Sequence, residues 1–287
     1  MKKTYILAAI SVLFWSTVAT VSKLLLGSID KYQVLCISAL FAAAALLVIN
    51  LLTGRLKRLR TFRTMDYVKT IVPSFLGNFL YYVFYYDGTG RMPTSQAFIV
   101  NYLWPIMSVV FACILLKEKL TGRKMIAFAM SFLGIFTVAG KDIFQFNGNI
   151  LIGTAMCTAG AVSYGLFTAL VKKWDYDRLL TMMLGFFTSS LLSLAVTLFK
   201  GVSWDIAPVA FLGLGWNGVC CMALASTCWM LALKEGNTAK VSNLAYITPF
   251  LSLVWVAVFL KEMPTVWSVA GLCLIMLGIL IQMKGKK

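Results

Sequence analysis

An amide and two aromatic side chains stand directly before a proline in the first half of the chain, in the run Asn101-Tyr102-Leu103-Trp104-Pro105. A proline inside a helix lacks the backbone N–H and leaves an upstream carbonyl without its usual partner. In an apolar surrounding that carbonyl needs another helix, a side chain or a wet cavity. Helical spacing puts Asn101 and Trp104 on neighbouring surfaces and turns Tyr102 elsewhere. We expect Trp104 to stack on or gate a small solute and Asn101 to hydrogen-bond it.

The same pattern returns in the second half, where Asn243, Ala245 and Tyr246 precede Pro249. We expect these three residues to face the same solute, and we expect Pro105 and Pro249 to break or bend their helices beside it. The alternative for both segments is packing between helices, with the asparagine as a hydrogen-bonding contact.

Four further polar or aromatic residues lie in the middle of apolar runs, namely Trp15, Asn78, Tyr82 and Tyr164. Tryptophan and tyrosine also gather in belts at membrane surfaces, which is the alternative for the aromatic members. Asn78 needs a hydrogen-bond partner at that depth, because an unpaired buried amide is costly. We therefore expect these residues to complete a solute-binding pocket.

Asp87 differs from the other acidic residues. Nine of the ten Asp and Glu residues lie in expected loops or at helix ends, whereas Asp87 lies in the last turn of an apolar run. An ionisable group near membrane depth is a candidate functional site. The alternative is an interfacial acid that pairs with Arg91.

The chain lacks the residues that several kinds of chemistry need. It contains no histidine, which excludes Ser-His-Asp and Cys-His nucleophilic sites and the usual metal sites with histidine ligands. Neither a Walker loop nor a G-x-G-x-x-G turn is present. We therefore expect no enzyme activity, no metal and no cofactor.

The elements that would position the candidate residues are membrane-spanning helices. Hydrophobic residues make up 60% of the 287 residues and charged residues 13%, and apolar runs of bilayer length separate short charged clusters. Hydropathy predicts an all-α integral membrane protein with ten spans, at 4–25, 32–52, 68–88, 94–116, 124–140, 149–171, 179–199, 207–233, 240–260 and 264–283.

The Lys and Arg residues lie mainly on one side of these spans. The side that holds both chain ends carries 20 of the 26, the other side carries 5, and Lys23 falls inside a span. Short basic loops stay in the cytoplasm, so we expect a multi-pass plasma-membrane protein with both termini cytoplasmic. The net charge of +16 then reflects cytoplasmic loops, with anionic lipid as a partner of the basic stretch 55–69 and no nucleic acid.

The chain contains an internal repeat. A shift of 144 residues brings Tyr102 onto Tyr246, Pro105 onto Pro249, and Lys117-Glu118 onto Lys261-Glu262. We expect two units, 1–145 and 146–287, of five helices each. An odd number of crossings inverts the second unit relative to the first, and inverted repeats are typical of carriers that work by alternating access.

At these motifs the chain resembles the drug/metabolite transporter superfamily, in its ten-helix branch of two EamA-type repeats. The resemblance covers essentially the whole chain and rests on the motifs Leu13-Phe14-Trp15-Ser16-Thr17, Pro105 with Lys117-Glu118, and Pro249 with Lys261-Glu262 and Gly271…Gly278. The run Val100-Asn101-Tyr102-Leu103-Trp104-Pro105 is most similar to the YddG-type branch, whose members export aromatic and other neutral amino acids.

This resemblance implies a pocket lined by Asn78, Trp104, Tyr164 and Ala245. We expect a secondary transporter, a monomer or weak dimer, that exports small metabolites such as neutral or aromatic amino acids. The alternative is an importer or exchanger of a nucleotide-derived or other cationic metabolite, with Asp87 as a binding residue.

Overall fold

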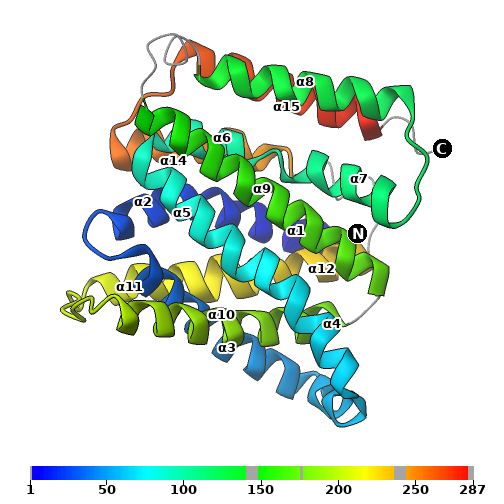
Figure 1. Ribbon diagram of the computed structural model, residues 1–287, viewed down its shortest axis with the longest axis vertical. Helices are drawn as coiled ribbons and strands as arrows, with labels where there is room; N and C mark the ends of the chain where they lie inside the picture. Colours follow the sequence, from blue (N-terminus) through cyan, green and yellow to red (C-terminus); the bar gives the residue numbers. More distant parts are fainter. Residues whose placement is uncertain (1, 140–147, 175–176, 236–243, 284–287) are drawn as a thin grey trace.

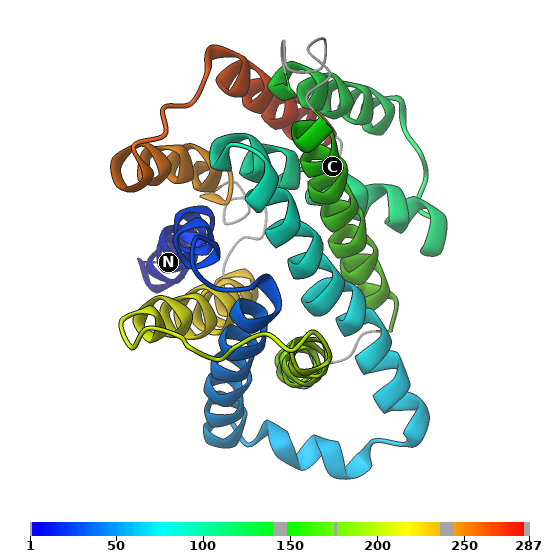
Figure 2. The ribbon, with the colours of Figure 1, turned by 60° about the vertical axis from the view of Figure 1, so that its left-hand side comes forward.

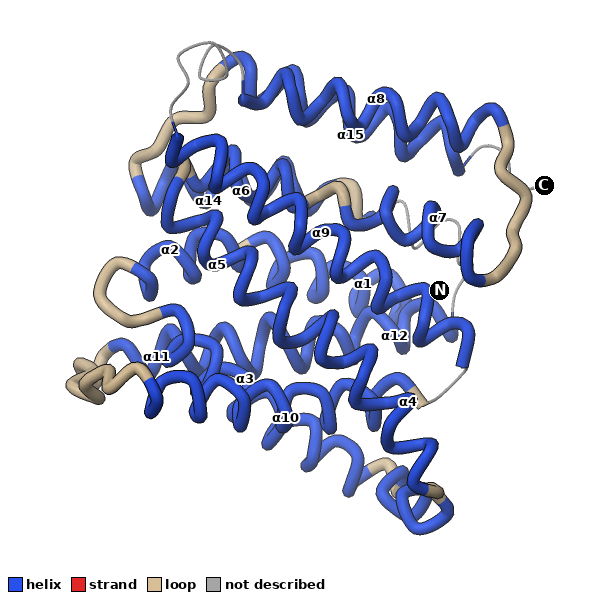
Figure 3. The backbone as a smooth tube through the Cα atoms, viewed as in Figure 1, coloured by secondary structure: helices blue, strands red, loops and turns tan. Residues whose placement is uncertain are grey.

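The computed structural model describes residues 2–139, 148–174, 177–235 and 244–283, and these residues form helices without a strand among them (Figure 1, Figure 3). The first half contains α1 (Lys2–Ser16), α2 (Val18–Leu26), α3 (Lys31–Leu52), η1 (Arg55–Thr61), α4 (Thr64–Ser74), η2 (Phe75–Leu80), α5 (Tyr81–Arg91), α6 (Thr94–Asn101), α7 (Trp104–Leu115) and α8 (Gly122–Ala139). The second half contains α9 (Gly148–Trp174), α10 (Arg178–Phe199), α11 (Ala210–Gly215), η4 (Trp216–Leu224), α12 (Ala225–Glu235), α14 (Ile247–Leu260) and α15 (Val266–Met283).

These helices combine into the ten predicted segments, several of which are built from two or three consecutive pieces. Six described segments are long and apolar enough to cross a membrane: Lys3–Leu26, Lys31–Leu52, Thr94–Leu115, Gly148–Trp174, Arg178–Phe199 and Ala210–Ala232. Ile247–Leu260 and Val266–Ile281 are shorter apolar helices. The continuous run α4–η2–α5 and helix α8 supply the two remaining segments. The first residues of the predicted ninth span lie outside the described part of the chain.

Corresponding helices of the two halves make corresponding contacts, as expected for a repeated structure. In the first half α1 packs on α12, and in the second half the corresponding helix α9 packs on α5. Helices α3 and α10, which correspond to each other, pack together, and so do α8 and α15 (Figure 1, Figure 2). The all-α fold of two five-helix repeats predicted from the sequence is confirmed.

The contact between α8 and α15 is close because glycines lie in it. A Cβ atom added to Gly134 would lie 2.9 Å from the carbonyl oxygen of Gly271, and one added to Gly278 would lie 2.8 Å from that of Ala127. Small residues allow helix backbones to approach closely in membranes, where dispersion contacts replace the hydrophobic effect between helices. Gly134 and Gly278 correspond to each other in the repeat, so the two contacts are the same contact made twice.

Among the described residues, four segments are irregular near their middle. The first is interrupted at Thr17, where Thr17 Oγ1 donates to the Phe14 carbonyl at 2.8 Å and offers the backbone an alternative partner. The fourth is interrupted at Tyr102 and Leu103, just before Pro105. The third and eighth contain the π-helical stretches η2 and η4, which occupy corresponding positions in the two repeats. Such stretches occur often at functional sites.

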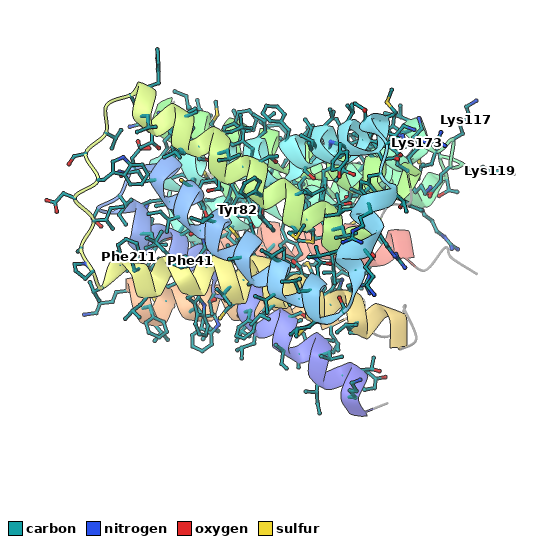
Figure 4. The ribbon with its side chains drawn as sticks, turned by 90° about the horizontal axis from the view of Figure 1, so that it is seen from below. Phe41, Tyr82, Lys117, Lys119, Lys173 and Phe211 are labelled. Carbon is teal, nitrogen blue, oxygen red and sulfur yellow. The ribbon has the colours of Figure 1, made fainter. Side chains whose placement is uncertain are left out.

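The helices α7 and α14 end alike. Lys117 and Lys261 follow these helices at corresponding positions, with φ of 54° and 55°. A left-handed residue ends a helix, and the glutamate that follows each lysine is turned toward neighbouring elements. Figure 4 shows Lys117, Lys119 and Lys173 at one end of the bundle, which is the side on which Figure 1 marks both chain ends.

Candidate functional site

One cavity lies inside the bundle and is lined by residues of both repeats. About 140 Å³ of it is open to the centre of a water molecule, roughly ten times the about 10–15 Å³ that a single buried water needs. A small metabolite therefore fits. The lining residues are Trp15, Val18, Asn78, Tyr81, Tyr82, Phe98, Asn101, Tyr102, Trp104, Tyr164, Arg178, Met182, Phe186, Cys221, Met222, Ser226, Trp229, Ala245 and Thr248.

Aromatic rings from several helices form the walls of this cavity. The Trp104 and Tyr164 rings meet edge to face, with centroids 5.2 Å apart, and the Tyr81 ring lies 4.9 Å from that of Tyr164. Elsewhere in the wall, the ring centroid of Trp15 on α1 lies 5.4 Å from that of Trp229 on α12. Rings held by other rings keep their orientation, so the cavity presents preformed flat apolar surfaces.

Two asparagines add unsatisfied polar atoms beside these rings. Asn101 Nδ2 donates to the Tyr81 hydroxyl at 3.0 Å, while Asn101 Oδ1 has no partner among the described residues. Asn78 Nδ2 likewise has no partner in the described part of the chain. A buried polar atom without a partner costs about 1–3 kcal/mol. A bound solute or water that reached these amides would remove that cost.

The backbone positions of these asparagines are set by local irregularities. Asn78 lies within η2, and a Cβ atom added to Gly185 on α10 would collide with its amide nitrogen. Asn101 is the last residue of α6, directly before the interruption at Tyr102.

Tyr102 links the interrupted fourth segment to the turn that precedes α14. Its hydroxyl donates to the Ala245 carbonyl at 2.7 Å, next to the turn that precedes α14. The expectation that Tyr102 points away from the candidate site is wrong, because Tyr102 lies outside the helix and regular helical spacing does not apply there. The prolines lie just downstream, with Pro105 in the first turn of α7 and Pro249 in the first turn of α14.

The structure brings together most of the residues predicted to bind a solute. Seven of them line the cavity: Trp15, Asn78, Tyr82, Asn101, Trp104, Tyr164 and Ala245. Tyr246 is half-buried and does not line the cavity, and Asn243 lies outside the described residues. The substrate role of these residues stays a prediction. Sequence reasoning did not single out the lining residues on α10, Arg178, Met182 and Phe186.

Asp87 lies outside the cavity, in a cluster of charges on the side opposite the chain ends. Its carboxylate accepts from Lys31 Nζ and, at 2.6 Å, from Arg91 Nε. Nearby, Lys23 Nζ donates to the Thr89 carbonyl at 2.8 Å. These contacts hold α2 and the start of α3 against the end of α5.

A second contact on that side joins the two repeats. Glu262, just after α14, accepts from the backbone N–H of Ser95 at 2.9 Å and from its hydroxyl at 3.0 Å. Ser95 lies in the first turn of α6, where a negative charge is also stabilised by the helix dipole. The start of α6 and the end of α14 are therefore tied together at this end, while Arg178 lines the cavity near the other.

A multi-pass helical bundle of two repeats, with a central cavity where interrupted helices meet, is the architecture of a membrane carrier. Two matches to the EamA-like transporter family cover residues 2–140 and 151–283. The chain belongs to this family, and it is a transporter of the EamA type within the drug/metabolite transporter superfamily.

Similar proteins share this class. An uncharacterized transporter of Clostridium kluyveri is 26% identical over 300 aligned positions, which cover 100% of this chain and 95% of the relative. The aromatic amino acid exporter YddG of Ancylobacter novellus is 26% identical over 191 positions, which cover 63% of this chain and 64% of the relative. A solved crystal structure superposes with a TM-score of 0.70 at 20% identity, covering 98% of this chain and 96% of the other, and so shares the fold.

Proposed function

We propose that this transporter exports neutral amino acids, aromatic ones among them, and that the central cavity is the substrate site. The observation that carries the proposal is the aromatic wall of that cavity, which residues of both repeats line beside the interrupted first and fourth segments. The similarity to an aromatic amino acid exporter supports the same substrate class.

The walls suit a flat apolar side chain with a polar head. A ring that enters the cavity stacks against Trp104 and Tyr164, and ring pairs add about 0.5–1.5 kcal/mol beyond the burial of their area. The free amide atoms of Asn78 and Asn101 supply hydrogen bonds to the polar groups of the solute. The site therefore combines burial of apolar surface, which favours many solutes, with a few directional hydrogen bonds, as small-molecule sites usually do.

We propose that transport proceeds by alternating access between two arrangements of the inverted repeats. In the arrangement described, Glu262 ties α14 to α6 on the side away from the chain ends. The positive-inside rule makes the side with the chain ends cytoplasmic, in the plasma membrane. The described arrangement is then closed to the outside, and the solute enters from the cytoplasm.

The remaining expectations belong to the same proposal. The chain acts without enzyme activity or a cofactor, as a monomer or weak dimer, on a small-molecule metabolite. Its basic segment η1 lies at the cytoplasmic surface, where Lys and Arg attract anionic lipid head groups. This placement accounts for the positive charge without nucleic acid.

Transport of a cationic metabolite with Asp87 as a binding residue has less support. Asp87 contacts two cationic side chains and does not line the cavity, and no Asp or Glu occurs among the described lining residues. If Asp87 bound the substrate, Asp87→Asn would abolish transport. The amino-acid proposal predicts that this variant keeps its substrate affinity.

The test is a comparison of intracellular and extracellular metabolites in cells that carry the wild-type chain, an empty vector, Trp104→Ala or Trp267→Ala. Trp267 is 55% exposed on α15 and serves as the matched control. We expect wild type and Trp267→Ala to release one class of neutral amino acids, and Trp104→Ala to release little. If no amino acid differs between wild type and empty vector, the proposal is wrong.

A further inference from the structure

One face of α10 forms a continuous strip of the cavity wall. Arg178, Met182 and Phe186 follow one another at intervals of four residues and all line the cavity. Residues four apart lie on the same face of a helix, about 6 Å apart along its axis. The strip therefore runs from a cation at the first residue of α10, near the end with the chain termini, to an aromatic ring about two turns deeper.

Arg178 has no anionic partner among the described residues. The adjacent acid, Asp177, is already engaged, because its Oδ2 accepts from Arg55 Nη1 at 2.6 Å and from Arg58 Nη1 at 2.9 Å. Its Oδ1 accepts from the backbone N–H of Leu179 at 3.1 Å and caps α10. The guanidinium at position 178 is thus left for a group that enters the cavity.

This location is unusual for a cation that has no anionic partner among the described residues. Arg178 is the first residue of α10, where the helix dipole disfavours a positive charge. The other polar groups among the described lining residues are amides and hydroxyls. None of these lining residues carries a carboxylate that could balance the positive charge of Arg178. Field and geometry at this end of the cavity therefore both favour an anionic ligand.

We propose that Arg178 binds the carboxylate of the transported solute and selects carboxylates with an apolar or aromatic body. This inference rests on the proposed function and deepens it. A carboxylate against the guanidinium forms charge-assisted, bidentate hydrogen bonds. The body of the solute then extends along α10 past Met182 toward Phe186, whose ring lies 6.4 Å from that of Tyr82.

The same geometry implies that the site binds the carboxylate of an amino acid more strongly than its ammonium group. The carboxylate has a dedicated cation, whereas the ammonium meets only aromatic faces and neutral oxygens, which bind cations more weakly. The site therefore requires the carboxylate and tolerates the loss of the ammonium. Three probes with the same ring separate these terms: L-phenylalanine, 3-phenylpropionate without the ammonium, and phenethylamine without the carboxylate.

The experiment measures binding of the three probes to the full-length protein purified in nanodiscs, by titration calorimetry. The variants are Arg178→Gln, Arg178→Lys and the control Arg60→Gln, which removes an exposed cation of the basic segment η1. We expect Arg178→Gln to weaken L-phenylalanine and 3-phenylpropionate by roughly 10- to 100-fold. Arg178→Lys should restore part of the affinity, and Arg60→Gln should change none.

Each other outcome has a distinct meaning. If wild type binds the carboxylates and Arg178→Gln binds them equally well, the role of Arg178 is wrong while the proposed function stands. Equal weakening of all three probes, or a preference of wild type for phenethylamine, also overturns the carboxylate assignment. If wild type binds none of the probes, the proposed function fails and the inference fails with it. Unchanged thermal unfolding of Arg178→Gln shows that the variant is folded.

Discussion

The contact between Glu262 and Ser95 offers a direct test of the closed side of the carrier. One carboxylate oxygen accepts two hydrogen bonds, from the backbone N–H and the hydroxyl of Ser95, and joins the end of α14 to the start of α6. The substitution Glu262→Gln keeps the size of the side chain and removes its charge. We expect this variant to shift the population toward the outward-open arrangement.

The expected magnitude follows from the surroundings of the carboxylate. A hydrogen bond to a charged group contributes about 1.5–3 kcal/mol, and a negative charge at a helix N-terminus adds about 0.3–1 kcal/mol. Glu262 is partly exposed, so solvent screening lowers this contribution, and the glutamine keeps a neutral acceptor. A net loss of about 1–2 kcal/mol corresponds to a population shift of roughly 5- to 30-fold.

Hydrogen–deuterium exchange of the protein in nanodiscs measures this shift. In Glu262→Gln, exchange should become faster in residues 94–101 and slower at the other end of the cavity, in residues 178–186. The reciprocal change separates a shift of the whole carrier from the loss of one local bond. The matched control is Glu118→Gln, the repeat-related glutamate on the opposite side of the bundle, which pairs with Lys172 instead. Faster exchange confined to Ser95 and its neighbours, without slower exchange inside, would refute the reasoning.

Three further substitutions test the packing and the charges. Lys117→Gly should raise the free energy of unfolding by about 0.5–1 kcal/mol, measured by denaturant titration in detergent, because φ is 54° there and glycine adopts that conformation without steric cost. Gly271→Val should lower the thermal midpoint clearly, since its Cβ would lie 2.6 Å from the Gly134 carbonyl oxygen, whereas Gly122→Val, which meets nothing within 4 Å, should not. The Lys172 ammonium holds the pKa of the Glu118 carboxyl below its usual value, so this stabilisation is present above the usual pKa and lost as the pH falls through the lowered one. Glu118→Gln should therefore make stability less sensitive to pH on the acid side, and an unchanged acid profile would contradict this assignment.

The sequence predicted the fold well because its strongest signals are physical requirements of a membrane. Apolar length and the uneven distribution of Lys and Arg set the number of spans, and the repeated Pro and Lys-Glu motifs set the two repeats. The substrate-site candidates Trp15 and Tyr164 were predicted from their position in the middle of apolar runs, and both line the cavity.

The details that sequence reasoning missed depend on local departures from helical regularity. The interruption at Thr17 arises from hydroxyl groups that bond the backbone, a pattern that also occurs in uninterrupted helices. The break before Pro105 turned Tyr102 into the cavity, against the spacing of a regular helix. Arg178 had the appearance of one more cytoplasmic charge, and only the packing of α10 reveals that its face lines the cavity.

The central claim is that the cavity binds and moves neutral amino acids with aromatic side chains. Efflux of radiolabelled L-phenylalanine from proteoliposomes that contain purified wild type, Trp104→Ala or Trp267→Ala tests it most directly. Our account predicts saturable efflux through wild type and Trp267→Ala, with an efflux rate reduced at least about tenfold for Trp104→Ala, because the loss of a stacked ring and its buried area amounts to about 1.5 kcal/mol or more. Efflux through Trp104→Ala equal to that of wild type, or no efflux above protein-free liposomes in any sample, would contradict it.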